Sequence, residues 1–499
     1  MHGNSRQSFL HILILVVAAI IIFYPIFYTE YAYTDELTGL WQWRSGMQDS
    51  SGTLLQYGRY VTAKLASILF GSVATIKGLT WIRILALTGW LINIPIWYFI
   101  LKKISEREKL PEILPFFSVL YMICTPSTII SIGWGACFEL FLANTLGLLS
   151  GYFLYRGIRF QDNRISLSGW NFIASLVAGV TCLFTYQNCF GCFLIPFLLL
   201  FISSSTVSRK LIIGIAGYFL VYVIYYVLFK YSLKANHIDE SIRTGLHINV
   251  GNKLPFFLAR PLNSAFHFTT LFNENSITGA VVYILTAAFW FVASFIQRKS
   301  LKPVSRFNYF LFLFCLLGLI YLPSLIVKEN YASNRTIFAL SMAVFFIVAD
   351  TLLRAKIIRQ KSSFIVGIVC CLFVINAWYN FNLQFLTPVS KEYDAVRKFV
   401  EANYHNGIDS IHFIQPAEDF FEKKYGITRS WDEFGVPSTF FPWTPEVLVR
   451  EIVYEKTGDA TITQKLIVKS WAGKDIYVSD TTFRTTSTQL VIDTEQLLK

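Results

Sequence analysis

The chain has 499 residues, of which 54% are hydrophobic and only 15% are charged. A soluble protein of this length carries more charge, so the composition excludes an ordinary soluble enzyme and favours a protein that crosses a membrane several times. The net charge of +12 does not indicate nucleic-acid binding. Much of the excess lies in short loops, whereas residues 388–499 hold 13 Lys and Arg against 17 Asp and Glu.

The first apolar run extends from Phe9 to Tyr28, about the ~20 residues that a helix needs to span hydrocarbon. It is longer than the apolar core of a cleavable signal, and no small-x-small cleavage pattern follows it, so we expect a retained helix. An outer loop over residues 29–79 comes next. Within it, Gly58 to Phe70 has the apolar spacing of a short helix that lies flat at the membrane surface.

Ten further apolar segments follow, which predicts an α-helical polytopic membrane protein with about 11 transmembrane helices. Every second loop is strongly basic, and this alternation indicates that those loops and the N-terminus are cytoplasmic. The C-terminus and a second long loop, at about 230–277, are then outside. The expected spans are 9–28, 80–101, 112–129, 136–155, 168–185, 189–203, 211–229, 278–296, 307–326, 336–353 and 363–381.

The character of the chain changes at Pro388, where the apolar blocks end. Strand-like runs at 408–414, 465–468 and 475–478 alternate with segments of helical periodicity at 389–403, 417–425 and 445–454. This pattern predicts a small α/β domain outside the membrane. We therefore divide the chain into a membrane domain, residues 1–387, and an extracytoplasmic domain, residues 388–499.

An acidic pair, Asp35 and Glu36, lies where the chain leaves the membrane after its first span. A carboxylate there can act as a general base on a hydroxyl group. Arginine side chains bind phosphate oxygens, and aromatic rings can stack on a sugar. The loop therefore holds what transfer from a lipid-linked sugar phosphate requires. Its aromatic residues are Tyr33, Trp41 and Trp43, and its arginines are Arg44 and Arg59.

One outward helix, an acidic pair and a flat interfacial helix resemble the GT-C superfamily of polytopic glycosyltransferases. Within it, Tyr33-Thr34-Asp35-Glu36 followed by Tyr57-Gly58-Arg59 is similar to the start of GtrII-like glucosyltransferases, which modify O-antigen. The tail, with Asp432-Glu433-Phe434-Gly435-Val436-Pro437-Ser438 and Val491-Ile492-Asp493, also looks like the tails of bacterial members.

The resemblance implies inverting transfer of a sugar, such as glucose, from a polyprenyl-phosphate donor to a cell-surface glycan or lipopolysaccharide acceptor. One carboxylate would take the proton of the acceptor hydroxyl while arginine stabilises the departing lipid phosphate. The acids here are adjacent rather than in a D-x-D spacing, and adjacent side chains diverge. We expect one base, Asp35, with Glu36 as the alternative.

Residues elsewhere complete the predicted site. Arg260, in the second outer loop, and Arg335, before the tenth span, are candidate phosphate ligands beside Arg44 and Arg59. Tyr57 and Glu329 join Tyr33, Trp41 and Trp43 as candidate sugar contacts. In the tail domain, Trp431, Asp432, Trp443 and Trp471 suit contact with an acceptor glycan, and a purely supporting tail domain is the alternative.

Two other functions compete with transfer: a lipid-linked-oligosaccharide flippase or transporter, and an O-antigen polymerase. Coupled transport usually places ionisable residues inside the helices, whereas the predicted spans are nearly free of them. We expect no cofactor, no metal ligands and no nucleic-acid partner, although the sequence leaves a divalent metal requirement open. The expected partners are the donor lipid, a glycan acceptor and the lipids of a bacterial inner membrane.

Overall fold

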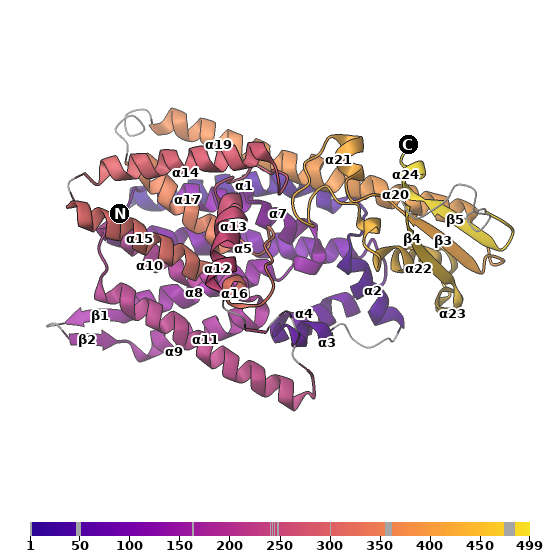
Figure 1. Ribbon diagram of the computed structural model, residues 1–499, viewed down its shortest axis with the longest axis horizontal. Coiled ribbons are helices and arrows are strands. Elements are labelled where there is room, and N and C mark those ends of the chain that lie inside the picture. The colour runs from indigo at the N-terminus through magenta and orange to yellow at the C-terminus, as the bar shows by residue number, and fades with distance from the viewer. Residues whose placement is uncertain are drawn as a thin grey trace.

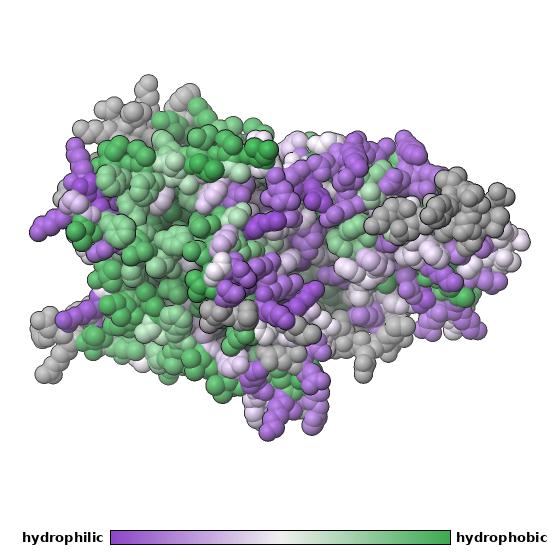
Figure 2. Space-filling model, viewed as in Figure 1, coloured by the Kyte–Doolittle hydropathy of each residue, from purple (hydrophilic) through white to green (hydrophobic). Residues whose placement is uncertain are grey.

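The computed structural model describes residues 2–45, 51–161, 164–239, 241, 243, 245–246, 249–299, 301–354, 362–473 and 485–499. The molecule is elongated, with a helical body at one end and a smaller domain containing a three-stranded sheet at the other (Figure 1). The chain N-terminus lies at the end of the body that is distant from this domain (Figure 1). Figure 2 shows that apolar side chains gather on the body and polar ones around the sheet domain.

Within the described residues, eight helices are long and apolar enough to cross a membrane. A ninth candidate is the pair α6 (Leu114–Cys124) and α7 (Pro126–Gly133), which is bent by 48°. The bend falls at Thr125, because the proline after it cannot continue the hydrogen bonding of α6. The eight segments are Arg6–Phe27, Leu79–Glu108, Gly135–Gly157, Gln187–Ser204, Arg209–Ala235, Ile277–Gln297, Pro303–Ile320 and Gly367–Asn403.

The prediction of a helical, multi-span protein is confirmed in this coarser form, but the number eleven is not. Helices also form at the remaining predicted spans, as α9 (Gly169–Thr185) and α17 (Phe338–Leu353), yet both are short. Side chains from Phe338 to Thr351 are buried, since α17 packs inside the body against α6, α13 (Pro261–Ala265) and α15 (Pro303–Ile320). A helix that is buried on all sides has an apolar sequence whether or not it spans a membrane, so the sequence of α17 does not show that it is a span.

The remaining elements of the body either lie within these candidate spans or connect them. A small hairpin of β1 and β2 joins α8 to α9, near the end that carries the N-terminus (Figure 1). The elements are α1 (His2–Phe23), η1 (Tyr24–Phe27), α5 (Leu79–Glu108), η2 (Gly135–Cys137), α8 (Leu140–Gly157), β1 (Ile158–Gln161), β2 (Arg164–Leu167), η3 (Gln187–Leu194), α10 (Ile195–Ser204), α11 (Arg209–Ala235), α14 (Ile277–Gln297), α16 (Leu322–Ile326) and α19 (Ser362–Tyr379).

Two long segments join the helices near the sheet domain. The first holds α2 (Asp35–Ser45), α3 (Ser51–Gln56) and α4 (Tyr60–Gly71), and α4 corresponds to the predicted interfacial helix. The second holds α12 (Val250–Ala259) and α13. Lys253 anchors α12, because its Nζ donates to the carbonyl of Glu329 at 3.1 Å and to Asn330 Oδ1 at 2.6 Å.

The sheet domain is continuous with the last long helix. The π-helical turn η5 (Asn380–Leu386) connects α19 directly to α20 (Thr387–Asn403), so the boundary drawn at Pro388 falls within one helical run. The parallel sheet has the order β4–β3–β5. The predicted strand at 475–478 lies outside the described residues, and β5 takes the other edge position. The elements are β3 (Ser410–Gln415), α21 (Phe420–Tyr425), η6 (Ser438–Phe440), α22 (Thr444–Thr457), α23 (Ala460–Lys465), β4 (Ile467–Ala472), β5 (Gln489–Asp493) and α24 (Thr494–Leu497).

Candidate functional site

The acidic pair begins helix α2, where carboxylates are favoured by the helix dipole. Thr34, just before the pair, has a positive φ of 41°. Its amide donates to Ser438 Oγ of the sheet domain at 2.9 Å. This turn fixes the start of α2 against the sheet domain and sends the two carboxylates in different directions.

Glu36 points into the protein and is fully buried. Its carboxylate accepts hydrogen bonds from Arg83 Nη2 at 2.5 Å, from Arg83 Nε at 3.2 Å and from the Tyr33 amide at 2.8 Å, and the Gly135 amide also donates to it. Arg83 is equally buried and lies flat over the Tyr31 ring, 3.5 Å from its centroid. These donors leave the Glu36 carboxylate little capacity for a substrate.

Asp35 points the other way, and its side chain is exposed to solvent. Protein nevertheless surrounds it closely enough that desolvation raises the pKa of its carboxyl group, while the positive charge of Arg335 and a hydrogen bond from the Trp443 side chain oppose that rise. The negative charge of Asp432 raises the pKa of Asp35 further. A carboxylate that is crowded, yet open to solvent, is available to take up a proton.

Arg335 lies at the centre of the groups around Asp35. Its Nη2 donates to Asp432 Oδ2 at 2.9 Å and to the Tyr331 hydroxyl at 2.5 Å, and its Nε lies 3.4 Å from Glu433 Oε1. The guanidinium also stacks on Trp134, 4.6 Å from the ring centroid. Arg335 therefore joins the helical body to the sheet domain beside Asp35.

The second acidic pair of the chain, Asp432 and Glu433, meets Arg335 from the sheet domain. Glu433 is fully buried and accepts from the Asn334 amide at 2.7 Å. Burial raises the pKa of Glu433 to about 7 despite the nearby cation. Asn334 is itself only 5% exposed.

Arg59 lies over the ring of Tyr186, 3.9 Å from its centroid. The charges of both Arg59 and Arg335 act on Glu139, whose side chain is only 2% exposed. The Nε of Arg59 is buried and has no hydrogen-bond partner. Two of the four predicted phosphate ligands thus lie near Glu139, and one of them, Arg59, has an unused donor.

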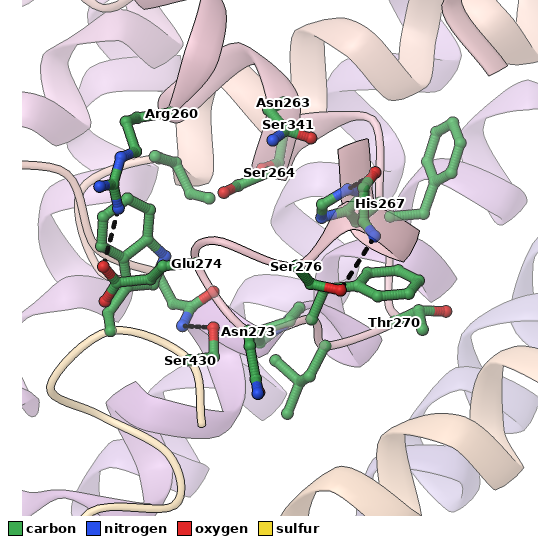
Figure 3. A pocket seen from close by; sticks show the side chains of 18 of the residues that line it. Arg260, Asn263, Ser264, His267, Thr270, Asn273, Glu274, Ser276, Ser341 and Ser430 are labelled. Atoms are coloured by element: carbon green, nitrogen blue, oxygen red, sulfur yellow. Dashed lines mark hydrogen bonds and ion pairs between the residues drawn. The ribbon is translucent and has the colours of Figure 1, made fainter. Parts of the chain in front are cut away.

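Arg260 occupies a separate position, at the end of α12. Its Nη1 donates to Glu274 Oε2 at 2.7 Å, and its guanidinium lies 5.6 Å from the Trp431 ring centroid. Figure 3 shows Arg260 directed toward Glu274 at one side of a polar pocket. The contacts of Arg260 include neither Arg59 nor Arg335, and its ion-pair partner is Glu274.

Arg260 lines two cavities. The polar pocket of Figure 3 has a volume of about 30 Å³, enough for water but not for a sugar. His267 lines it and contacts the Gly279 carbonyl at 2.9 Å, and burial lowers its pKa. The second cavity is an open groove of about 490 Å³ between α12 and the sheet domain. Its volume falls within the roughly 300–1,000 Å³ of small-molecule sites.

The remaining predicted sugar contacts are dispersed. Tyr33 is 1% exposed and donates to the Asp432 carbonyl at 3.1 Å. Trp41 is 5% exposed and faces α22, where Arg450 lies 5.5 Å from its ring centroid. The Tyr57 carbonyl accepts from Gln187, and Glu329 lies at the surface near Arg243. The side chains of Trp43 and Arg44 lie outside the described residues.

Several residues of the site were not identified from the sequence. Neither Arg83 nor Trp134 was among the predicted site residues. The signal that could have found Arg83 is the cost of a charge in an apolar segment, which demands a buried partner.

In the part of the chain that the structure describes, no group of three His, Cys, Asp or Glu side chains could hold a metal ion.

The geometry joins one accessible carboxylate, a second acid–arginine cluster, aromatic rings and an open groove at the junction of body and sheet domain. A carboxylate in this setting can accept a proton from a hydroxyl, and arginine donors can bind an anionic leaving group.

No protein-family model matches the chain, and no curated protein is significantly similar to it.

Proposed function

We propose that this protein is a membrane-embedded glycosyltransferase of the GT-C type, similar to GtrII-like enzymes. It transfers a sugar from a polyprenyl-phosphate donor to a cell-surface glycan or lipopolysaccharide acceptor. Eleven spans, a cytoplasmic N-terminus and a periplasmic sheet domain in a bacterial inner membrane are part of the proposal. The polar surface around the sheet domain, next to an apolar body, supports it (Figure 2).

The proposal depends on one observation above all: the two adjacent carboxylates have opposite environments. Glu36 is buried and bonded to Arg83, whereas Asp35 is exposed at the junction of body and sheet domain. This difference supports Asp35 as the base and gives Glu36 the role of holding the start of α2 in place. It also explains how an adjacent pair can serve chemistry that needs one base.

In the proposed reaction, Asp35 takes the proton of the acceptor hydroxyl as its oxygen attacks the anomeric carbon. The bond from that carbon to the phosphate oxygen breaks, and its electron pair leaves with the polyprenyl phosphate. Attack opposite to the leaving group inverts the configuration. Arg59 and Arg335 stabilise the departing phosphate, and the unpartnered Nε of Arg59 supports its part in this step.

Transfer of radiolabelled sugar from polyprenyl-phosphate donors tests the proposal, in membranes containing wild type, Asp35→Asn or Glu36→Gln at equal amounts of folded protein. We expect Asp35→Asn to lose transfer by about 10²–10⁴-fold, the usual contribution of a general base. Glu36→Gln should retain it per folded molecule. Full activity of Asp35→Asn, with loss in Arg335→Ala, would contradict the assignment and favour a polymerase. Sugar translocation without a glycosidic product would favour a flippase.

A further inference from the structure

The 490 Å³ groove lies between three segments that are distant in the sequence. Helix α12 supplies Phe256, the segment before α17 supplies Tyr331, and loops of the sheet domain supply Trp431, Asp432 and Phe441. Each of these side chains is partly accessible to solvent. The groove is therefore an open, aromatic-walled surface and exists only because the sheet domain is docked on the body.

The groove adjoins the proposed base. Asp432 lies in its wall, and the negative charge of Asp432 acts on the Asp35 carboxyl. At the same end, the Phe441 ring is 5.1 Å from the ring of Trp443, a side chain that acts on the pKa of Asp35. A molecule held in the groove would reach toward Asp35 from the sheet-domain side rather than from among the apolar helices.

Trp431 is the most unusual residue of the groove. Its φ is +55°, a left-handed conformation that is unfavourable for a bulky side chain. Strained backbone of this kind persists where the surroundings enforce it, and it is concentrated at binding and catalytic sites. Arg260 also lines the groove, and its guanidinium lies 5.6 Å from the Trp431 ring centroid, so the cation and the aromatic ring form adjacent parts of the same wall.

The charges of the groove are paired. Glu274 pairs with Arg260 at 2.7 Å, Asp432 with Arg335 at 2.9 Å, and Glu418 with Arg429 at 2.9 Å. Each acid that lines the groove thus has its own arginine, so neither an anionic nor a cationic ligand gains an unpaired partner. Paired carboxylates still have lone pairs that accept hydrogen bonds from hydroxyl groups.

These observations point to one class of ligand. Flat aromatic faces suit the apolar C–H faces of pyranose rings, and planar polar groups beside them suit ring hydroxyls. A peptide that binds by adding a strand would need a strand edge, and none of the residues lining the groove belongs to a strand. We propose that the groove is the acceptor site and that it binds a neutral glycan stacked on Trp431. This proposal rests on the proposed function.

Binding to an array of neutral hexose and N-acetylhexosamine oligosaccharides, together with uronate- and sialate-bearing ones, tests this inference. The full-length protein is used in detergent, as wild type, Asp35→Asn, Trp431→Ala, Phe441→Ala and Trp81→Ala. Trp81 is the matched control, because it is an exposed tryptophan, 71% accessible, that does not line the groove. Thermal melting reports whether each variant is folded.

We expect wild type and Trp81→Ala to bind neutral glycans alike, and Asp35→Asn to bind them while losing transfer. Trp431→Ala should weaken that binding at least tenfold, and Phe441→Ala should do so even if Trp431→Ala fails to fold. Equal binding of acidic glycans, unchanged binding in both groove variants, or folded wild type that binds none of the glycans would overturn the inference.

The two proposals fail separately. Glycan binding that depends on Trp431 but is never followed by sugar transfer would contradict the proposed function and leave the groove assignment intact. Sugar transfer with an unchanged acceptor KM in Trp431→Ala and Phe441→Ala would contradict the groove assignment and leave the function intact.

Discussion

Arg83 Nη2 lies 2.5 Å from Glu36 Oε2, and both side chains are completely excluded from solvent. The pair links α5 to the start of α2 and thereby holds the segment that presents Asp35. A buried charge pair of this kind is costly to break, because removing one partner leaves the other charge uncompensated.

Glu36→Gln should therefore destabilise the protein by about 3–5 kcal/mol, the usual effect of breaking a buried pair. Thermal melting in detergent measures this. Adding Arg83→Met should recover part of the loss, because the double variant buries no unpaired charge. Lys77→Ala is the control: Lys77 is 78% exposed and 3.7 Å from Glu30, and such surface pairs contribute about 0–1 kcal/mol. Similar losses in Glu36→Gln and Lys77→Ala would contradict the structural role.

The acid limb of the pH–rate profile should report Asp35. Desolvation raises the pKa of Asp35, and the positive charge of Arg335 lowers it. Since a base acts in its deprotonated form, transfer should rise with pH through this pKa and then level off. Arg335→Gln removes the cation, so the limb should move to higher pH, apart from any loss in maximal rate.

The matched control for that profile is Arg243→Gln. Arg243 is exposed and lies 3.7 Å from Glu329, so its loss should leave the acid limb in place. If Arg335→Gln and wild type had the same limb while both variants remained folded, Asp35 would not be the group that titrates.

The docking of the sheet domain should weaken as pH rises, because buried Glu433 then loses its proton. Burial raises its pKa to about 7, above the 4.5 of an ordinary glutamate. The folded protein then binds more protons than the unfolded chain between about pH 4.5 and 7, so stability falls as pH increases across that window. Glu433→Gln cannot titrate and should show a smaller decrease in melting temperature between pH 5 and pH 8. The exposed Glu329→Gln should melt like wild type, and an unchanged slope in Glu433→Gln would count against this account.

Gly58 precedes Arg59 and is constrained in two ways. Its φ is +72°, and a Cβ there would lie 2.2 Å from the Tyr225 hydroxyl oxygen. Gly58→Ala should therefore cost about 2–4 kcal/mol through the left-handed conformation and the overlap, and should displace Arg59. Gly52→Ala, where nothing lies within 4 Å of the added carbon, should be nearly neutral. Equal melting temperatures of the two variants would refute the constraint.

The sequence alone determined the helical class, since the length of an apolar run is a local property that decides whether a segment can be solvated by lipid. It also located the acidic pair, because two carboxylates just after the first apolar run are visible without knowledge of the fold. It could not count the spans, because α17 is apolar through burial inside the protein and α6–α7 is broken at Thr125. Positions that face lipid and positions that are buried in protein both favour apolar side chains, so the sequence alone does not distinguish them.

Only the tertiary structure decided which carboxylate is free. The partner of Glu36 is 47 residues away on α5, and the residues that face Asp35 come from the far end of the chain, in Asp432 and Trp443. Sequence spacing predicts which side chains share a helix face, whereas pairing across elements depends on how whole helices and domains pack. Asp35 and Glu36 are neighbours with the same chemistry, and packing alone gives one an arginine in the interior and leaves the other open to solvent.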